Sequence, residues 1–120
     1  MIKAFKLYTG TDGHSHIQTG TVSQAGTNQA TGVRFQESPP YSFYDWHNAP
    51  GPQYVITLSG TLEFETRPGE TFILHPGEIL IAMDTTGTAH KWTLIDDEPW
   101  QRVYVTFDAD YPVNFIPDIT

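Results

Sequence analysis

Apolar residues in this chain alternate with polar ones over short runs, and no stretch sustains an apolar residue every three to four positions. Such alternation is typical of β-strands, whereas a period of 3.6 would indicate helices. The runs are rich in Val, Ile, Thr and aromatic residues and are separated by turn-forming residues. They predict strands at about 3–9, 14–23, 32–37, 41–47, 53–58, 61–66, 71–75, 78–83, 88–95 and 101–107. About ten short strands with no linker between them indicate one all-β domain, 1–120, built as a sandwich or closed barrel.

Three Gly-containing turns refine this pattern. Ser59-Gly60 separates two apolar runs by two residues, which predicts a tight hairpin between strands 53–58 and 61–66. Pro68-Gly69 and Pro76-Gly77 place Pro before Gly, the order that suits a type II turn, since its second central residue needs a positive φ.

Composition and charge narrow the function. The 120 residues carry 14 Asp and Glu against 6 Lys and Arg, a net charge of -8. Such a chain repels phosphate backbones, so we expect no nucleic-acid partner and no anionic membrane surface. No apolar run reaches the length of a membrane span, and residues 1–6 do not resemble a signal peptide, so we expect a cytoplasmic protein. The absence of cysteine excludes disulfides, thiolate ligands and Cys nucleophiles.

Two segments carry the candidate chemistry. In the first, His47 lies six residues before Gln53, which lies seven residues before Gly60; in the second, Gly87-Thr-Ala-His90 follows the run that begins at Gly77. Residues two apart on a strand share a face, so polar side chains at such spacings can converge inside a barrel.

These segments resemble the two motifs of the cupins, small double-stranded β-helix (jelly-roll) barrels, and the resemblance covers about residues 43–107. It implies a divalent metal held by His47, Gln53 and His90, with Zn, Fe, Mn or Ni all compatible with such ligands. The chain departs from the motifs at Ala49, where the second His belongs, and at Gln53, where a Glu belongs. A missing anionic ligand weakens the attraction for a dication, so whether a metal binds stays open.

Residue parity extends the predicted pocket. Val55 and Thr57 share the face of Gln53, and Trp92 shares that of His90, which makes Thr57 and Trp92 candidate ligand-binding residues. The same parity puts Phe43 and Asp45 on the face of His47 unless a bulge intervenes, with Tyr44 and Trp46 pointing away.

The remaining candidates have weaker patterns. Arg102 could face inward and bind a substrate carboxylate, with a surface charge as the favoured alternative. His14 and His16 share a strand face and are expected to be solvated, although His16 could reach the barrel mouth as a third imidazole. His75 precedes a Pro-Gly turn and is expected to be exposed.

Three functions remain open. The first is a metal-dependent isomerase, lyase or dioxygenase acting on a small polar or carboxylate-bearing metabolite, with His47 and His90 as catalytic residues. The second is a metal-free module that binds or senses a small molecule. The third is a metal-free enzyme in which the same histidines act as acid and base.

Barrel edges of this kind are commonly covered by an exchanged strand, so we also expect a homodimer in which residues 2–8 pair with the partner.

Overall fold

The computed structural model describes residues 1–119, and every regular element in that range is a β-strand. The strands are β1 (Ile2–Thr9), β2 (Ser15–Val22), β3 (Gly32–Ser38), β4 (Phe43–His47), β5 (Gln53–Ser59), β6 (Leu62–Thr66), β7 (Thr71–Leu74), β8 (Ile79–Ala82), β9 (His90–Leu94), β10 (Trp100–Thr106) and β11 (Ile116–Pro117). Within residues 1–119 no helix is long and apolar enough to cross a bilayer.

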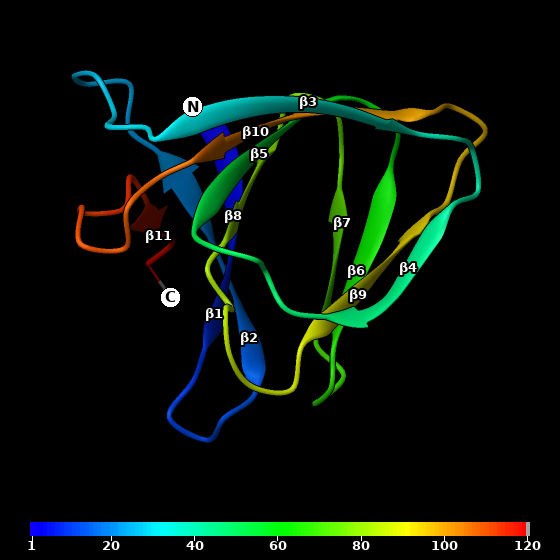
Figure 1. The fold of residues 1–120 in the computed structure, drawn as a ribbon, viewed down its shortest axis with the longest axis horizontal. Helices are drawn as coiled ribbons and strands as arrows, with labels where there is room; N and C mark the ends of the chain where they lie inside the picture. The colour runs from blue at the N-terminus through cyan, green and yellow to red at the C-terminus, as the bar shows by residue number, and fades with distance from the viewer. Residues whose placement is uncertain (120) are drawn as a thin grey trace.

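The strands form two sheets that face each other (Figure 1). The larger sheet has the order β11-β2-β1-β8-β5-β10-β3, and the smaller has the order β4-β9-β6-β7. All neighbours are antiparallel except β1 and β8, which are parallel. The all-β, single-domain jelly-roll prediction agrees with this architecture.

The core fills the space between the two sheets. Alternate residues of β5, β6, β9 and β10 are buried, as the alternation in sequence predicts. At its centre the rings of Phe5, Phe72 and Phe64 stack in series, with centroids 4.5 and 4.9 Å apart. Aromatic pairs at such distances contribute about 0.5–1.5 kcal/mol each beyond their burial.

The turns correct one prediction and refine another. The predicted hairpin between residues 53–58 and 61–66 is wrong, because β5 pairs with β8 and β10 in one sheet, and β6 with β7 and β9 in the other. Gly60 has a φ of 94° and carries the chain from sheet to sheet. Around Pro76-Gly77, the Glu78 amide donates to the His75 carbonyl at 3.1 Å, as a type II turn requires. Around Pro68, the Gly69 amide donates instead to the Thr66 carbonyl at 2.9 Å, which starts the turn one residue earlier.

The two ends of the chain pack on the larger sheet. β1 lies inside it, between β2 and β8 of its own chain, so a single copy completes the pairing without a strand from a partner. The C-terminal segment returns across β2 through β11, and the backbone of Ile116 lies so close to Gly20 that a Cβ on Gly20 would overlap the Ile116 carbonyl oxygen.

Candidate functional site

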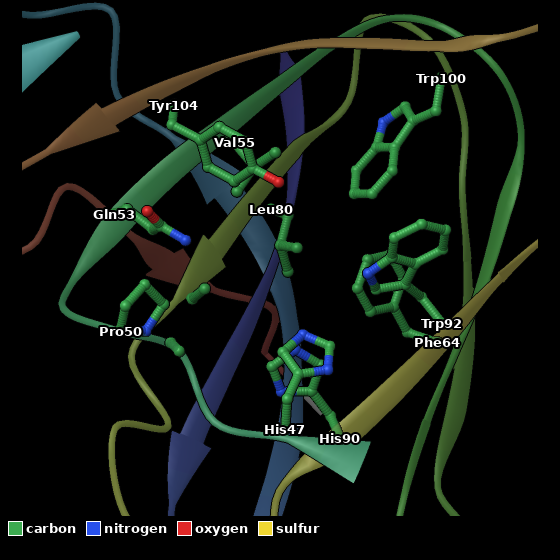
Figure 2. Close-up of a pocket in the computed structure, with 12 residues that line it drawn as sticks. His47, Pro50, Gln53, Val55, Phe64, Leu80, His90, Trp92, Trp100 and Tyr104 are labelled. Carbon is green, nitrogen blue, oxygen red and sulfur yellow. The ribbon is translucent and has the colours of Figure 1, made fainter. Parts of the chain in front are cut away.

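His47 and His90 meet at one end of the barrel, although 43 positions separate them in the chain. They are directly opposite each other where β4 pairs with β9, and their ring centroids are 4.5 Å apart with an interplanar angle of 61°. Figure 2 shows both rings projecting from these strands into the same cavity.

An irregularity in β4 places His47 in this position. Tyr44 is opposite Trp92 and His47 is opposite His90, so three residues of β4 span two of β9. This bulge puts Tyr44 on the inner face with His47, and their ring centroids are 4.2 Å apart. The exception that the parity prediction made for a bulge therefore applies: Phe43 is paired with the exposed Thr93 on the outer face, and Asp45, inside the bulge, is exposed.

A buried carboxylate orients His90. Its Nδ1 lies 2.5 Å from Oδ2 of Asp84, and the Ser15 hydroxyl donates to the same oxygen at 2.6 Å. Asp84 is fully buried, and its other oxygen has no partner among the described residues. Because a carboxylate accepts hydrogen bonds, Nδ1 of His90 carries the proton and Nε2 is left with its lone pair free for a ligand.

The backbone orients His47 in the same sense. Its Nδ1 donates to the Asp45 carbonyl at 2.7 Å, which leaves Nε2 free. Burial is the largest effect and lowers the pKa of His47; the hydrogen bond to the Asp45 carbonyl opposes it, and the smaller electrostatic effects of His90 and Asp84 lower and raise the pKa, respectively. His47 therefore stays neutral at pH values where an ordinary histidine begins to be protonated.

The cavity beside the two imidazoles is small and mostly aromatic. Its volume is about 40 Å³, and Phe64, Trp92, Trp100 and Tyr104 form much of its wall. Trp92 and Trp100 meet edge to face with centroids 4.7 Å apart. A space of this size holds a few water molecules or a compact polar group.

The predicted ligand-binding residues divide between this cavity and the layer behind it. Gln53 is buried and lines the cavity, and Figure 2 shows its amide on the β5 side, apart from the imidazoles. Trp92 also lines it. Thr57 is buried outside the cavity wall, where its hydroxyl accepts a hydrogen bond from Trp100 Nε1 at 3.1 Å.

Arg102 is buried, with 3% of its surface exposed, so the favoured expectation of a surface charge is wrong. Its guanidinium lies 3.8 Å from the ring centroid of Trp100 and donates to the Tyr104 hydroxyl, the Ser38 hydroxyl and the Trp100 carbonyl at 3.0, 2.7 and 3.1 Å. These contacts hold Trp100 and Tyr104 in the cavity wall from behind.

The other histidines lie outside the site. His16 is held between Glu70 and Asp12, with nitrogen–oxygen distances of 2.6 and 2.8 Å, and so does not provide a third imidazole at the cavity. His14 contacts the Thr88 hydroxyl at 2.9 Å. His75 is largely exposed and pairs with Glu78 at 3.1 Å.

The metal that the sequence resemblance implies can be tested on the donor atoms. Within residues 1–119 no three His, Cys, Asp or Glu side chains come together as a metal site requires. His47 and His90 provide two donors, Ala49 lines the cavity without a donor atom, and the neutral amide of Gln53 lies apart from both imidazoles. This set does not fit a resident transition metal, which needs at least three converging ligands.

Asp84 and Ser15 are the site residues that sequence reasoning missed. Asp84 directly follows the apolar run of β8 and lies six positions before His90, so an acid at the end of a buried strand was the available signal. Ser15 offered none, because its hydroxyl reaches Asp84 only through the pairing of β1 with β2 and β8.

No family model and no curated protein matches the chain. Solved structures do. A cupin domain from Bordetella pertussis is 22% identical, with 75% of this chain and 94% of that chain covered and a TM-score of 0.52. An uncharacterised Klebsiella pneumoniae protein with a double-stranded β-helix domain is 20% identical, with 84% of each chain covered and a TM-score of 0.52.

The same fold also occurs in a protein whose structure is described as a complex with another protein. Drosophila melanogaster CENP-C, in a structure described as bound to CAL1, is 16% identical, with 84% of this chain and 78% of that chain covered and a TM-score of 0.53. Similarities at this level of identity concern the fold alone, since one fold supports many functions.

Proposed function

We propose that this chain, a cupin by fold, is a metal-independent enzyme that transfers protons within a small polar metabolite, as in an isomerisation or an elimination. The observation that carries the proposal is the chain of hydrogen bonds from Ser15 through Asp84 to His90, which leaves His90 Nε2 free toward the cavity, next to the free Nε2 of His47.

The two imidazoles have different environments. Asp84 accepts the Nδ1 proton of His90 and fixes the ring, which leaves Nε2 of His90 toward the cavity, where it can take a proton from a substrate and return it. The lowered pKa of His47 keeps this ring neutral, which suits it to accept a proton. Two imidazoles that face one small cavity provide the two proton-transferring groups that an isomerisation or an elimination needs.

The cavity wall supports this chemistry. No Asp, Glu, Lys or Arg of the described chain lines it, so no charged side chain in the wall competes for the transferred proton. Hydrogen bonds and charges act more strongly in such surroundings than in water. The 40 Å³ volume limits the reacting part of the substrate to a few atoms.

Proton transfer can be detected before the substrate is known. Chelator-treated protein is incubated in D₂O with a panel of small hydroxy, keto and sugar acids, and ¹H NMR follows the loss of carbon-bound protons to solvent. We expect exchange with at least one compound, and a fall of about 10²-fold or more in His47→Gln and in His90→Gln. His75→Gln is the matched control, because His75 is exposed away from the cavity.

The pH dependence gives a second readout. A neutral His47 is needed as the base, so the rate falls on the acidic side only as pH drops through a pKa that lies below the ordinary 6.5. This acidic limb is expected to disappear in His47→Gln. Stoichiometric transition metal in untagged protein, with exchange that is lost on chelation and restored by the ion, would instead establish the metal-dependent alternative.

A further inference from the structure

Tyr104 brings a hydroxyl to the cavity that the proton transfer between substrate and imidazoles does not use. Its ring is buried and lines the cavity. Figure 2 shows the hydroxyl projecting inward from β10, while the rings of His47 and His90 project into the cavity from its other end. A substrate that occupies the cavity therefore has a hydroxyl on one side and two imidazoles on the other.

The hydrogen bonding of this hydroxyl leaves its proton available. Nε of Arg102 donates to the Tyr104 oxygen at 3.0 Å, so the oxygen is the acceptor in this contact. A guanidinium has only donors and cannot accept the hydroxyl proton in return. Within residues 1–119 no other hydrogen bond involves this hydroxyl. Its proton is therefore free for an acceptor atom of a molecule in the cavity.

A buried positive charge lies directly behind the hydroxyl. Arg102 is 3% exposed, and no carboxylate in the described part of the chain forms an ion pair with it. A buried charge without a partner strongly favours a negative charge nearby. The buried carboxylate of the site, Asp84, lies instead behind His90. The two sides of the cavity thus differ in charge, and an oxygen that gains negative charge is favoured beside Tyr104.

We propose that Tyr104 is a further catalytic residue, whose hydroxyl donates a hydrogen bond to the carbonyl oxygen of the substrate, and that the substrates are small ketones or aldehydes with a hydrogen on the adjacent carbon. This inference rests on the proposed function and names its substrate class. The cavity of about 40 Å³ admits few atoms, and the carbonyl oxygen, its carbon and the adjacent carbon are only three.

The reaction step balances without an oxidant or a reductant. Nε2 of one of the two imidazoles takes the proton from the carbon next to the carbonyl. The electron pair of the broken C–H bond forms a C=C bond, and the π pair of the carbonyl moves to its oxygen, which becomes an enolate oxygen held by Tyr104. Return of a proton from the imidazole to carbon restores the carbonyl. A donor aimed at the oxygen where charge develops stabilises the transition state more than the substrate.

Deuterium exchange in Tyr104→Phe tests the contact, with pyruvate and hydroxyacetone as probes and chelator-treated protein in D₂O. We expect the exchange rate to fall by about 10²–10³-fold, as when one donor to an oxyanion is removed. Tyr54→Phe is the matched control, because the Tyr54 hydroxyl also accepts one hydrogen bond, from the Asn114 amide at 2.9 Å, but Tyr54 does not line the cavity. This control is expected to exchange at the wild-type rate.

The outcomes separate this inference from the proposed function. Equal exchange rates in wild type and in Tyr104→Phe, or an equal fall in Tyr104→Phe and Tyr54→Phe, would overturn the role of Tyr104 and leave the proposed function standing. A wild-type chain that exchanges no compound would overturn both.

The substrate class is tested on the wild-type chain, independently of how the variants fold. Pyruvate is paired with lactate, and hydroxyacetone with propane-1,2-diol, so that each carbonyl compound is compared with its own alcohol. We expect exchange only in the carbonyl compound of each pair, because the alcohol has no carbonyl oxygen to take up the electron pair. Exchange of an alcohol at the rate of its carbonyl partner would overturn the substrate class.

A spectroscopic measurement separates the contact from a structural role of the ring. Tyr104→Phe removes the acceptor of Arg102 Nε, so thermal unfolding first establishes that the variant is folded. The ¹³C resonance of the carbonyl carbon of labelled pyruvate is expected to move to a higher chemical shift on binding to wild type and to Tyr54→Phe, since a hydrogen bond polarises the carbonyl. In folded Tyr104→Phe this change is expected to be lost. The same change in Tyr104→Phe as in wild type would contradict the hydrogen bond.

Discussion

The Asp84→Asn substitution tests the arrangement on which the proposed chemistry depends. Asparagine has nearly the shape of aspartate, so the volume of this fully buried position is unchanged. The substitution removes the charge behind His90 and replaces one oxygen by an amide nitrogen. The hydrogen bonds at 2.5 Å from His90 and 2.6 Å from Ser15 then lose the contribution of the carboxylate charge.

The size of the effect follows from these two contacts. A hydrogen bond to a charged group contributes about 1.5–3 kcal/mol and a neutral one about 0.5–1.5 kcal/mol, so the bond to His90 loses about 1–2 kcal/mol. That corresponds to roughly a 5- to 30-fold lower rate. If the amide nitrogen turns toward His90, Nδ1 must become the acceptor and Nε2 takes the proton, and the loss reaches about 10²–10⁴-fold, as for a misplaced acid or base.

The unfolding free energy is expected to change much less than the rate. Asp84 Oδ1 is buried without a partner among the described residues, so removing the charge also removes a desolvation penalty. Deuterium exchange, thermal unfolding and ¹⁵N NMR of the histidine rings measure the three quantities on one sample. The reasoning is refuted if Asp84→Asn exchanges protons at the wild-type rate while ¹⁵N NMR shows the same His90 tautomer. If Asp84→Asn lowers the deuterium-exchange rate and the thermal stability to the same extent, the role of Asp84 is structural only.

Two further predictions concern groups around the site. Glu70 first, and then Asp12, raise the pKa of His16, so the stabilisation by these contacts is fully present below about pH 6.5 and is lost as pH rises through the raised value. The difference in Tm between wild type and His16→Gln is therefore expected to be largest near pH 6, to vanish at alkaline pH and to shrink with salt, and a difference that grows with pH would contradict it. Arg102→Lys keeps the charge but cannot make the three hydrogen bonds to Tyr104, Ser38 and Trp100 together, so we expect destabilisation by about 1–3 kcal/mol in urea unfolding. The rate of deuterium exchange in Arg102→Lys is expected to fall only because the rings of Trp100 and Tyr104 shift. If the variant were as stable as wild type but showed no deuterium exchange, Arg102 would contact the substrate directly.

The all-β architecture was predictable because alternation along a strand is a local property. Gln53, Val55 and Thr57 follow one another at intervals of two, and all three face inward as that interval predicts. His90 and Trp92 do the same on β9. The meeting of His47 with His90 was accessible only through the resemblance to a family, because the pairing of β4 with β9 is a long-range contact.

The errors arise where long-range packing overrides a local rule. The bulge before His47 shifts β4 by one residue, which reverses the faces of Phe43 and Tyr44, and no residue in Phe43–His47 signals it. Gly60 has the positive φ expected of a tight turn, but whether a turn joins two neighbours in one sheet or connects two sheets depends on the partners of both strands. Arg102 was expected at the surface because burial of an arginine is rare without a carboxylate, and here aromatic stacking and three neutral acceptors replace that partner.

The charges around the cavity are consistent with the proposed proton transfer and do not favour a bound metal ion, although the two imidazoles occupy the positions of metal ligands in the motif. A dication in partly dry surroundings needs anionic ligands, and the only carboxylate near the imidazoles in the described chain is Asp84, which lies behind His90 and is fully buried. Ala49 removes a donor and Gln53 removes a negative charge at the positions where the motif resemblance places ligands. The Nδ1 proton of His90 satisfies this carboxylate oxygen without any further ligand. Burial is the main cause of the lowered pKa of His47, and the neighbouring His90, whose ring centroid is 4.5 Å away, lowers it further.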